Sequence, residues 1–600
     1  MKLVQSGTAA LRRRAATFRS RAATDRSIRD LYFHIDLRSL AAFRILIATL
    51  LLIDLAERWP DLEAFYTSAG VLAGVSEPTR WFTLLQYCGT LPTAQLFFAI
   101  AALCYVGLLV GYRTRLFHIL SFVCFTSIVN YNLMVRAGDD TVLVAMLLWT
   151  AFLPLGGRLS VDALRSRNVE QRGDPSFAAF CAIAQIGVIY FCTAFTKSGA
   201  TWHEGTAVYY ALQLDQFATG FARIVRELPL PLLKLFTWAS LAAEFAALPL
   251  ILSPVCQPFL RRVFIVSLTA LHVGIALTTN LELFAAKMIA TFSLLLSDAD
   301  WKLLSTAAKS VCLSALRFGR MLKFLHLPSV TTTGAQVIAG REDQLQLDTP
   351  RVERHTSVPR AAREPMPRIA AYSQIVVAAL FITALAEAYN SNIRPRLHTA
   401  LCPEFRLLRG FLMQPQVLQD WNLFAPDPSR DNGWWVVDGV TETGARFDPL
   451  TGRVPTLDKP ADLASRHDRY WRKYLSRLPA RTSKAYRPGF ARYITRVNHR
   501  SFPPGQRLRA FKLIYVRDRT PPPGAPAVPP KPTVVLSWDC FEDRIAAANA
   551  TLRQRRCRDG TSSLFLRTST CLECAPNLAK EHACLFSNAN AARALAPAAF

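Results

Sequence analysis

A single lysine stands where a long apolar run gives way to polar residues. The run that begins at Phe177 ends at Lys197, and Trp202, His203 and Glu204 follow shortly afterwards. Two kinds of chemistry suit such a lysine. Its ammonium group can extend to the headgroups at the edge of a membrane, which is a structural role. Alternatively, partial burial depresses the pKa of a lysine and makes the neutral amine available as a base.

The elements that would position this lysine are membrane helices. Of the 600 residues, 51% are hydrophobic, and long apolar runs alternate with short charged loops. This pattern is typical of a polytopic membrane protein. The first 35 residues are polar and rich in arginine, so we expect the first span itself to direct insertion. The formal charge of +27 lies largely beside the spans, which favours anionic lipid over nucleic acid as a partner.

We predict a mainly α fold, in which a helical bundle of about nine spans precedes an extracytoplasmic α+β or β-rich module. The predicted spans cover residues 40–55, 92–111, 116–135, 141–155, 177–196, 230–252, 263–279, 281–296 and 369–389. With this count every basic loop falls on one side of the membrane. Residues 198–228 read as a loop or re-entrant segment. The N-terminus is then cytoplasmic, and the membrane is expected to be a plasma membrane.

The alternation of apolar runs with charged loops divides the chain into segments of different composition. They are a basic cytoplasmic tail (1–35), the bundle (36–300), a cytoplasmic linker (301–368), the last span (369–389), an outside module (390–520), a proline-rich connector (521–532) and a cysteine-containing segment (533–600). Within the module, residues 434–440 and 512–516 predict strands. Residues 462–478 predict an amphipathic helix.

Six cysteines of the predicted outside portion favour disulfides, because that compartment is oxidising. Four residues there also allow a weaker alternative. Cys571, Cys574, His582 and Cys584 offer sulfur and imidazole ligands that suit zinc, although the spacing is loose.

Several ionisable residues fall within or beside the predicted spans: Arg44, Asp54, Asp139, Asp140, Lys197, Glu244, His272 and Lys287. An isolated charge in hydrocarbon costs about 2.5–3.5 kcal/mol on insertion scales, so these groups should pair or line a polar cavity. As structural pairs we expect Arg44 with a carboxylate and Glu244 with Lys287. A cavity lined by acid, base and imidazole would instead hold a polar group or move protons.

Several motifs occur in an order that resembles a known membrane domain. They are residues 36–45 (DLRSLAAFRI), 52–55 (LIDL), 62–67 (LEAFYT), 138–140 (GDD), 153–156 (LPLG), 160–162 (SVD) and Lys197-x4-Trp202-x-Glu204-Gly205, with Glu244 and His272. The chain is similar to the HTTM domain, the "horizontally transferred transmembrane" domain shared with vitamin K-dependent γ-carboxylases. Residues 420–424 (DWNLF) and 471–478 (WRKYLSRL) also resemble the segment that follows the last span of those enzymes.

The resemblance implies a function for the lysine. In the carboxylases the matching lysine deprotonates reduced vitamin K, and O2 then converts the quinol into a strong base. That base removes a γ-proton from a glutamyl side chain, which takes up CO2. Lys197 is therefore the expected base, with His272, Glu244 and Trp202 as supporting candidates. The implied cofactor is reduced vitamin K or another membrane quinol, and the implied partner is a secreted peptide or protein.

Two positions depart from the carboxylase pattern. Gly157 stands where we align a histidine implicated in stabilising the carbanion, and Tyr474 stands where a cysteine would pair with Cys88. A non-enzymatic membrane protein, acting in maturation or export of a secreted peptide, is therefore the alternative. Transport of a small polar solute would use the same buried charges, but the sequence shows no inverted repeat.

Overall fold

The computed structural model describes residues 31–73, 81–166, 175–310, 368–393, 410, 412, 414, 421–460 and 469–541. The chain divides into two compact units. One comprises Met1–Leu295 with Val377–Phe600, and the other comprises Leu296–Val376. The predicted linker 301–368 lies mostly outside the described residues, as do the basic tail and nearly all of the C-terminal cysteine segment.

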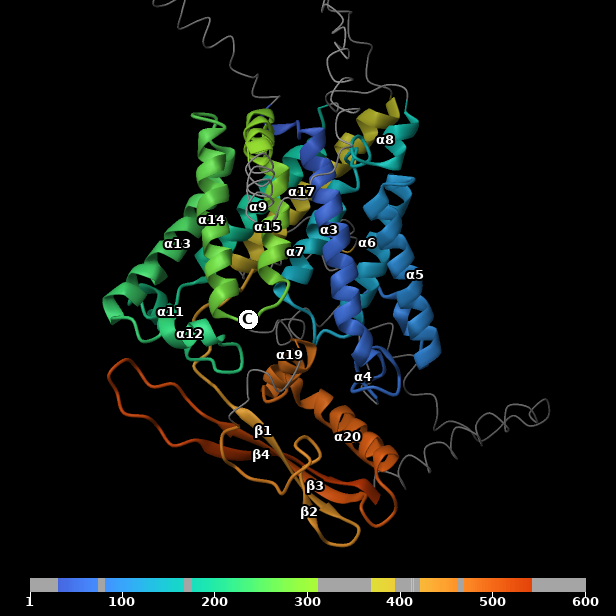
Figure 1. Ribbon diagram of the computed structural model, residues 1–600, viewed down its shortest axis with the longest axis vertical. Coiled ribbons are helices and arrows are strands. Elements are labelled where there is room, and N and C mark those ends of the chain that lie inside the picture. Colours follow the sequence, from blue (N-terminus) through green and yellow to red (C-terminus); the bar gives the residue numbers. More distant parts are fainter. Residues whose placement is uncertain are drawn as a thin grey trace, which may run out of the picture. The chain divides into compact units, whose positions relative to one another are not determined.

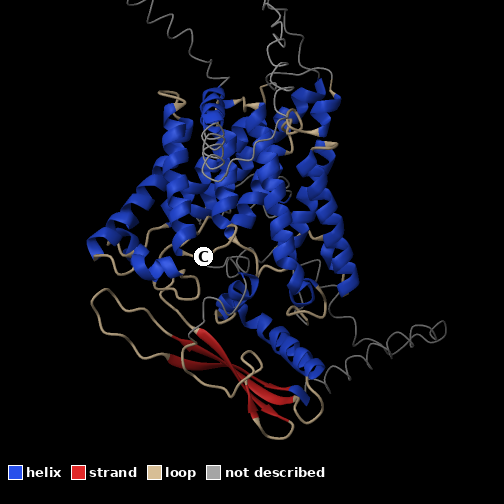
Figure 2. Cartoon of the chain, viewed as in Figure 1, coloured by secondary structure: helices blue, strands red, loops and turns tan. Residues whose placement is uncertain are grey.

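Helices dominate the first unit (Figures 1 and 2). Those that satisfy both the length and the hydropathy of a membrane span are α3 (Leu37–Arg58), α5 (Leu91–Val110), α9 (Phe177–Thr196), α13 (Leu230–Leu252), α14 (Phe259–Thr278) and α17 (Arg368–Asn392). Apolar side chains such as Leu235, Val266 and Ile100 remain exposed on α13, α14 and α5. Exposed apolar surface of this kind fits a lipid environment.

The count of nine spans is not confirmed. Each predicted span does contain a helix, but three are too short or too polar in the part of the chain that the structure describes. These are α6 (Thr114–Tyr131), α7 (Gly138–Thr150) and α15 (Phe284–Phe292). Apolar composition alone does not separate a helix that faces lipid from one that other helices surround.

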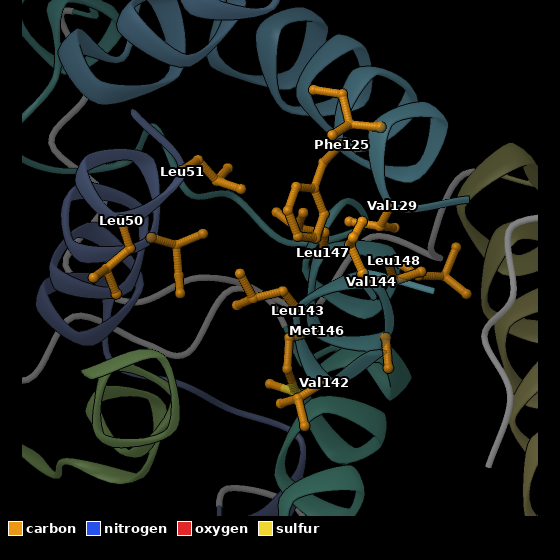
Figure 3. Packing of buried hydrophobic residues seen from close by; sticks show 14 of the residues in the cluster. Leu50, Leu51, Phe125, Val129, Val142, Leu143, Val144, Met146, Leu147 and Leu148 are labelled. Atoms are coloured by element: carbon orange, nitrogen blue, oxygen red, sulfur yellow. The ribbon is translucent and has the colours of Figure 1, made fainter. Parts of the chain in front are cut away.

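Helix α7 illustrates this difference. Its residues from Val142 to Leu147 are completely buried. Figure 3 shows Leu143, Val144 and Leu147 among side chains that include Phe125 of α6 and Leu51 of α3. Because protein covers this helix on its sides, it needs neither the length nor the exposed face of a span that contacts lipid.

Residues 198–228 form a loop with short helices, as the sequence predicts. They are α10 (Ala200–His203), α11 (Ala207–Leu212) and α12 (Gly220–Val225), and two other short helices of the unit are α4 (Leu62–Tyr66) and α8 (Val161–Arg165). The SVD motif that begins α8 has a structural role. The carboxylate of Asp162 accepts hydrogen bonds from the backbone N–H groups of Arg113 (2.9 Å) and Thr114 (2.7 Å). It thereby caps the start of α6.

The C-terminal module is α+β. Its antiparallel sheet has the order β2-β1-β3-β4, formed by β1 (Trp434–Thr441), β2 (Arg446–Phe447), β3 (Leu508–Arg517) and β4 (Lys531–Asp539). Figure 1 shows α19 (Arg469–Arg477) and α20 (Arg487–Ser501) beside this sheet. In the register of the central pair, Trp435 lies opposite Tyr515. The Trp435 indole donates to the carbonyl oxygen of Leu475 at 2.9 Å, which fixes α19 against the sheet.

The proline-rich run joins two neighbouring strands. It follows β3 and ends as β4 begins, and the two strands pair along their length, with Leu513 opposite Leu536. Residues 531–539 therefore belong to the same sheet as residues 508–517. Proline is tolerated there because β4 is an edge strand, whose free side needs no ladder hydrogen bonds.

The predicted disulfides are not found among the described cysteines. Cys88 is a free thiol, and so are the described cysteines within the helical bundle. Tyr474 occupies the position matched to a bridging cysteine, and it packs against Phe65 and Phe490 at ring-centroid distances of 5.8 Å and 5.6 Å. An aromatic cluster thus holds α19 to the bundle at this position.

Candidate functional site

A cavity lies where the helical bundle meets α19. Side chains of α9, α13, α14 and α15, the start of α7, the segment 423–424 and α19 line it. Its empty volume is about 880 Å3, including the part that opens to solvent. One wall is apolar and includes Ile189, Leu271, Ile275, Phe284 and Phe424.

Lys197 lines this cavity and forms an ion pair there. It follows the last residue of α9, and its Nζ donates to both carboxylate oxygens of Glu244 on α13, at 2.7 Å and 2.5 Å. Both side chains are nearly fully buried. The Nζ also lies 4.4 Å from the centre of the Trp202 ring. The carboxylate and the indole face together hold the amine in one place.

A histidine and a tyrosine form a second polar pair in the same cavity. The Tyr190 hydroxyl and the His272 Nε2 are 2.6 Å apart, and both side chains are buried. The other ring nitrogen, Nδ1, has no hydrogen-bond partner among the described residues. An orphaned buried nitrogen in a cavity wall is a natural contact for a polar group of a ligand.

The segment 421–428 clamps the loop that carries Lys197. Trp202 donates from its indole nitrogen to the carbonyl oxygen of Phe424 at 3.0 Å. The carboxylate of Asp427 accepts from the backbone N–H of Thr201 at 2.9 Å. A Cβ on Gly199 would lie 2.1 Å from the Asp427 side chain, so a larger residue there would displace the Asp427 carboxylate. The DWNLFAPDP segment is therefore a structural partner of the lysine loop.

A network of buried charges lies next to the cavity. Lys287 of α15 has its Nζ 3.0 Å from Asp54, 2.9 Å from Asp139 and 3.0 Å from Asp140. All of these side chains are almost completely buried. One ammonium group thus joins α3, α7 and α15.

Two arginines complete the network. Arg58 contacts Asp54 at 2.6 Å, and Arg469 of α19 contacts Asp139 at 2.6 Å. The Tyr470 hydroxyl donates to Asp54 at 3.2 Å. Three cations therefore balance three aspartates, which satisfies the rule that buried charges are paired. Although burial opposes the charge of Arg469, Asp139 more than offsets this and holds the pKa of Arg469 well above its usual value.

Helix α19 supplies the cationic wall of the cavity. Arg469, Arg472 and Lys473 all line it. Arg469 pairs with Asp139, and Arg472 pairs with Glu282. These cations come from the C-terminal module, whereas the apolar lining residues come largely from the membrane helices.

The structure brings together the site residues expected from the sequence. Lys197, Glu244 and His272 line one cavity, and Trp202 contacts the lysine. His203, which follows Trp202, is exposed and takes no part in the cavity. Cys571, Cys574, His582 and Cys584 lie outside the described residues, within which no group of side chains could hold a metal ion.

Two expected structural pairs were wrong. Glu244 pairs with Lys197 rather than with Lys287, whose partners are aspartates. Arg44 donates to the carbonyl oxygen of Leu159, and within the described residues it forms no ion pair, although the charge of Asp162 acts on it. A helical sequence shows which residues share a face, but it does not show which helices become neighbours.

Gly157 lies away from the cavity. It follows the C-terminal end of α7, whereas Asp139 in the first turn of that helix lines the cavity. A helix of 13 residues is about 20 Å long. A side chain at position 157 would meet Leu37 and the backbone of Pro154. The glycine there has no direct bearing on chemistry beside Lys197.

The sequence did not single out several cavity residues: Tyr190, Arg469, Arg472 and Lys473. The sequence did contain a signal for Tyr190. This residue precedes Lys197 by about two helical turns, so the two side chains fall on the same side of α9. The WRKYL segment also combined aromatic and basic residues. Its charges alone do not indicate that they point into the bundle.

Residues 32–301 match the family model of the HTTM domain. The chain contains an HTTM domain. This range agrees with the segment 36–300 in which the motifs occur. With its apolar helices, the HTTM domain makes this an integral membrane protein. No curated protein and no solved structure gives a match to the chain.

The HTTM domain does not complete the cavity by itself. Lys197, Glu244, His272 and Tyr190 lie within the matched range, but Phe424, Arg469, Arg472 and Lys473 lie beyond it. The C-terminal module therefore contributes one wall of the site, as well as the clamp on the lysine loop.

Proposed function

We propose that the cavity of this HTTM protein is the active site of a quinol-dependent carboxylase that acts on glutamyl side chains. One observation carries the proposal: the Lys197–Glu244 pair and the Tyr190–His272 pair converge on one cavity that also has an apolar wall. That combination suits a ligand with an aromatic ring and an acidic hydroxyl. Proton abstraction is the reaction class that these groups perform.

The residues present fit a quinol. Its ring would rest on the apolar wall formed by Ile189, Leu271 and Ile275, and its hydroxyl would face Lys197 or the unpartnered Nδ1 of His272. With O2, a bound quinol supplies the strong base that removes a γ-proton, and CO2 supplies the new carboxyl group. The side chains of the cavity bind, orient and accept the first proton.

The lysine can accept a proton because it shares one with Glu244. Burial penalises the charges of both groups, so transfer of the shared proton from Nζ to the carboxylate costs less than it would in water. The neutral amine then takes the proton of the acidic hydroxyl. Lys197 is then an ammonium group and Glu244 a neutral carboxylic acid. The positive charge of the lysine faces the oxygen anion. The indole face of Trp202 lies beside the amine and stabilises its charged form.

Reconstitution tests this proposal directly. The purified full-length protein would be placed in lipid vesicles with reduced vitamin K or menaquinol, O2, bicarbonate and a peptide that contains glutamate. Formation of both quinone epoxide and carboxylated peptide is the expected result. If the folded protein forms neither product with either quinol, the carboxylase proposal is wrong.

A second function fits one observation. Lys197 is already paired with Glu244, as in a structural ion pair. Under this alternative the protein acts without catalysis in the maturation or export of a secreted peptide. The same vesicles would then bind the peptide and form neither product.

Replacing Tyr190 with phenylalanine should lower the rate of epoxide formation by about 10- to 100-fold. The substitution keeps the ring but removes the hydroxyl that contacts His272 Nε2 at 2.6 Å, so the imidazole loses its partner and its fixed tautomer. Tyr209→Phe is the matched control, since that hydroxyl is half-buried and lies outside the cavity. Equal rates for both variants would exclude a role for the Tyr190–His272 pair.

We propose further that the cavity end of the bundle faces the outside, because the basic loops lie toward the other end. Cys256 tests this orientation. It is exposed in the connection that precedes α14, whereas Asn280, just beyond the end of α14, lines the cavity. With the other cysteines replaced by alanine, an impermeant maleimide should label Cys256 only after permeabilisation. A cysteine introduced by Glu204→Cys should react in intact cells, and the reverse pattern would invert the topology.

A further inference from the structure

The cations that line the cavity each have a carboxylate partner, with one exception. The pairs are Lys197 with Glu244, Arg469 with Asp139 and Arg472 with Glu282. Lys473 lines the same cavity, and its Nζ makes no hydrogen bond or ion pair to any residue within the described ranges. The cavity thus contains one amine that its own side chains leave unpaired.

The surroundings of this amine favour an anion. When Lys473 is protonated, the cavity lining carries one more positive charge than negative, since three carboxylates face four cations. Charged groups reach it from its own helix (Arg469 and Arg477) and from α7 (Asp139 and Asp140). Burial, and next the charge of Arg477, lower the pKa of Lys473 to about 7. A bound anion would reverse this effect and stabilise the ammonium form.

The position of Lys473 indicates which ligand brings the anion. It lies on α19, which the C-terminal module contributes to the cavity lining, whereas the membrane helices contribute most of the apolar lining. A quinol dissolved in lipid meets the apolar wall first and carries no carboxylate. A peptide approaching from the aqueous side meets α19.

We propose that Lys473 binds the side-chain carboxylate of the glutamyl peptide and so positions it in the cavity. The choice of a glutamyl peptide rests on the proposed function, whereas the binding of a carboxylate requires no catalysis. Lys473 is then a substrate-binding residue in a segment outside the HTTM domain itself.

Equilibrium binding to the full-length protein in nanodiscs, without quinol, tests the proposal. The probes are a short peptide with one internal glutamate and the same peptide with glutamine. The wild-type protein should prefer the glutamate peptide by about 10- to 100-fold, the range for a charge-assisted contact that is shielded from water. Lys473→Met should abolish the preference, and Lys473→Arg should restore part of it. Lys484→Met, which removes an exposed lysine of the same module, should leave it unchanged.

Two further measurements separate a loss of binding from a loss of folding and test the charge of Lys473. Lys473→Met should not lower the melting temperature below pH 7, because the half-buried, unpaired ammonium is a cost in the free protein. The glutamate preference should weaken as the pH rises from about 6 to about 9, as the amine loses its proton.

The outcomes separate the binding proposal from the catalytic one. A preference that survives Lys473→Met, or a wild-type protein that binds both peptides equally, overturns the role of Lys473. A preference that depends on Lys473 in a protein that forms no carboxylated product supports the binding site and refutes the carboxylase.

Discussion

Lys197→Met should reduce the formation of quinone epoxide and of carboxylated peptide together, by about 100- to 10,000-fold, the range for loss of a positioned general base. Methionine keeps the unbranched, apolar shape of the lysine stem but cannot accept a proton. Because the first proton transfer precedes both products, the two rates should fall in parallel. Epoxide measured by chromatography and peptide measured by mass spectrometry check this result.

The partner of Lys197 makes it possible to separate catalysis from stability. Lys197→Met alone leaves the Glu244 carboxylate buried without its cation, which costs about 3–5 kcal/mol of folding free energy. Adding Glu244→Gln removes the unpaired charge. The double variant should therefore regain most of the melting temperature while remaining inactive.

Glu204→Gln is the matched control for charge near the lysine loop, since Glu204 is exposed. It should change neither activity nor melting temperature appreciably. Activity that survives in the stable double variant would show that Lys197 is not the base.

Lys287→Met should also lower stability strongly, by about 3–5 kcal/mol. This lysine contacts three aspartates within 3.0 Å and is completely buried. Without it, three buried carboxylates share only the two arginines, Arg58 and Arg469. Thermal unfolding in nanodiscs, followed by intrinsic fluorescence, should show the shift.

The control is an exposed ion pair with a similar N–O distance. Lys302 lies 2.9 Å from Asp298, the same separation as Lys287 from Asp139, but its side chain is 73% exposed. Exposed ion pairs of this kind contribute less than about 1 kcal/mol. Lys302→Met should therefore leave the melting temperature nearly unchanged. Equal shifts in melting temperature for Lys287→Met and Lys302→Met would mean that burial of the Lys287 network does not add to stability.

Hydropathy predicted the helical elements well but not the count of spans. The segments that form α3, α9 and α13 read correctly as membrane helices, because a long apolar run is a local property. Helix α7 also contains an apolar run, from Val142 to Leu148, yet other helices surround it and it has only 13 residues. Local composition does not contain that difference, which arises when the helices pack.

In the C-terminal module, local signals again located the elements. The sequence predicted strands at residues 434–440 and 512–516, and these residues lie in β1 and β3. The role of α19 was not visible in the same way. Its arginines and lysine look like a solvated face in sequence, but Arg469 ends up buried against Asp139.

The sequence by itself determined that this chain is a helical membrane protein with an HTTM domain, and it identified Lys197 as the residue to explain. Only the tertiary structure decided which charges meet. Lys197 and Glu244 are 47 positions apart, and Arg469 and Asp139 are 330 positions apart. Hydrophobic patterning acts over a few residues, whereas the partner of a buried charge depends on which helices become neighbours. For this reason the candidate base was readable from the sequence, and the pair and the cavity around it were not.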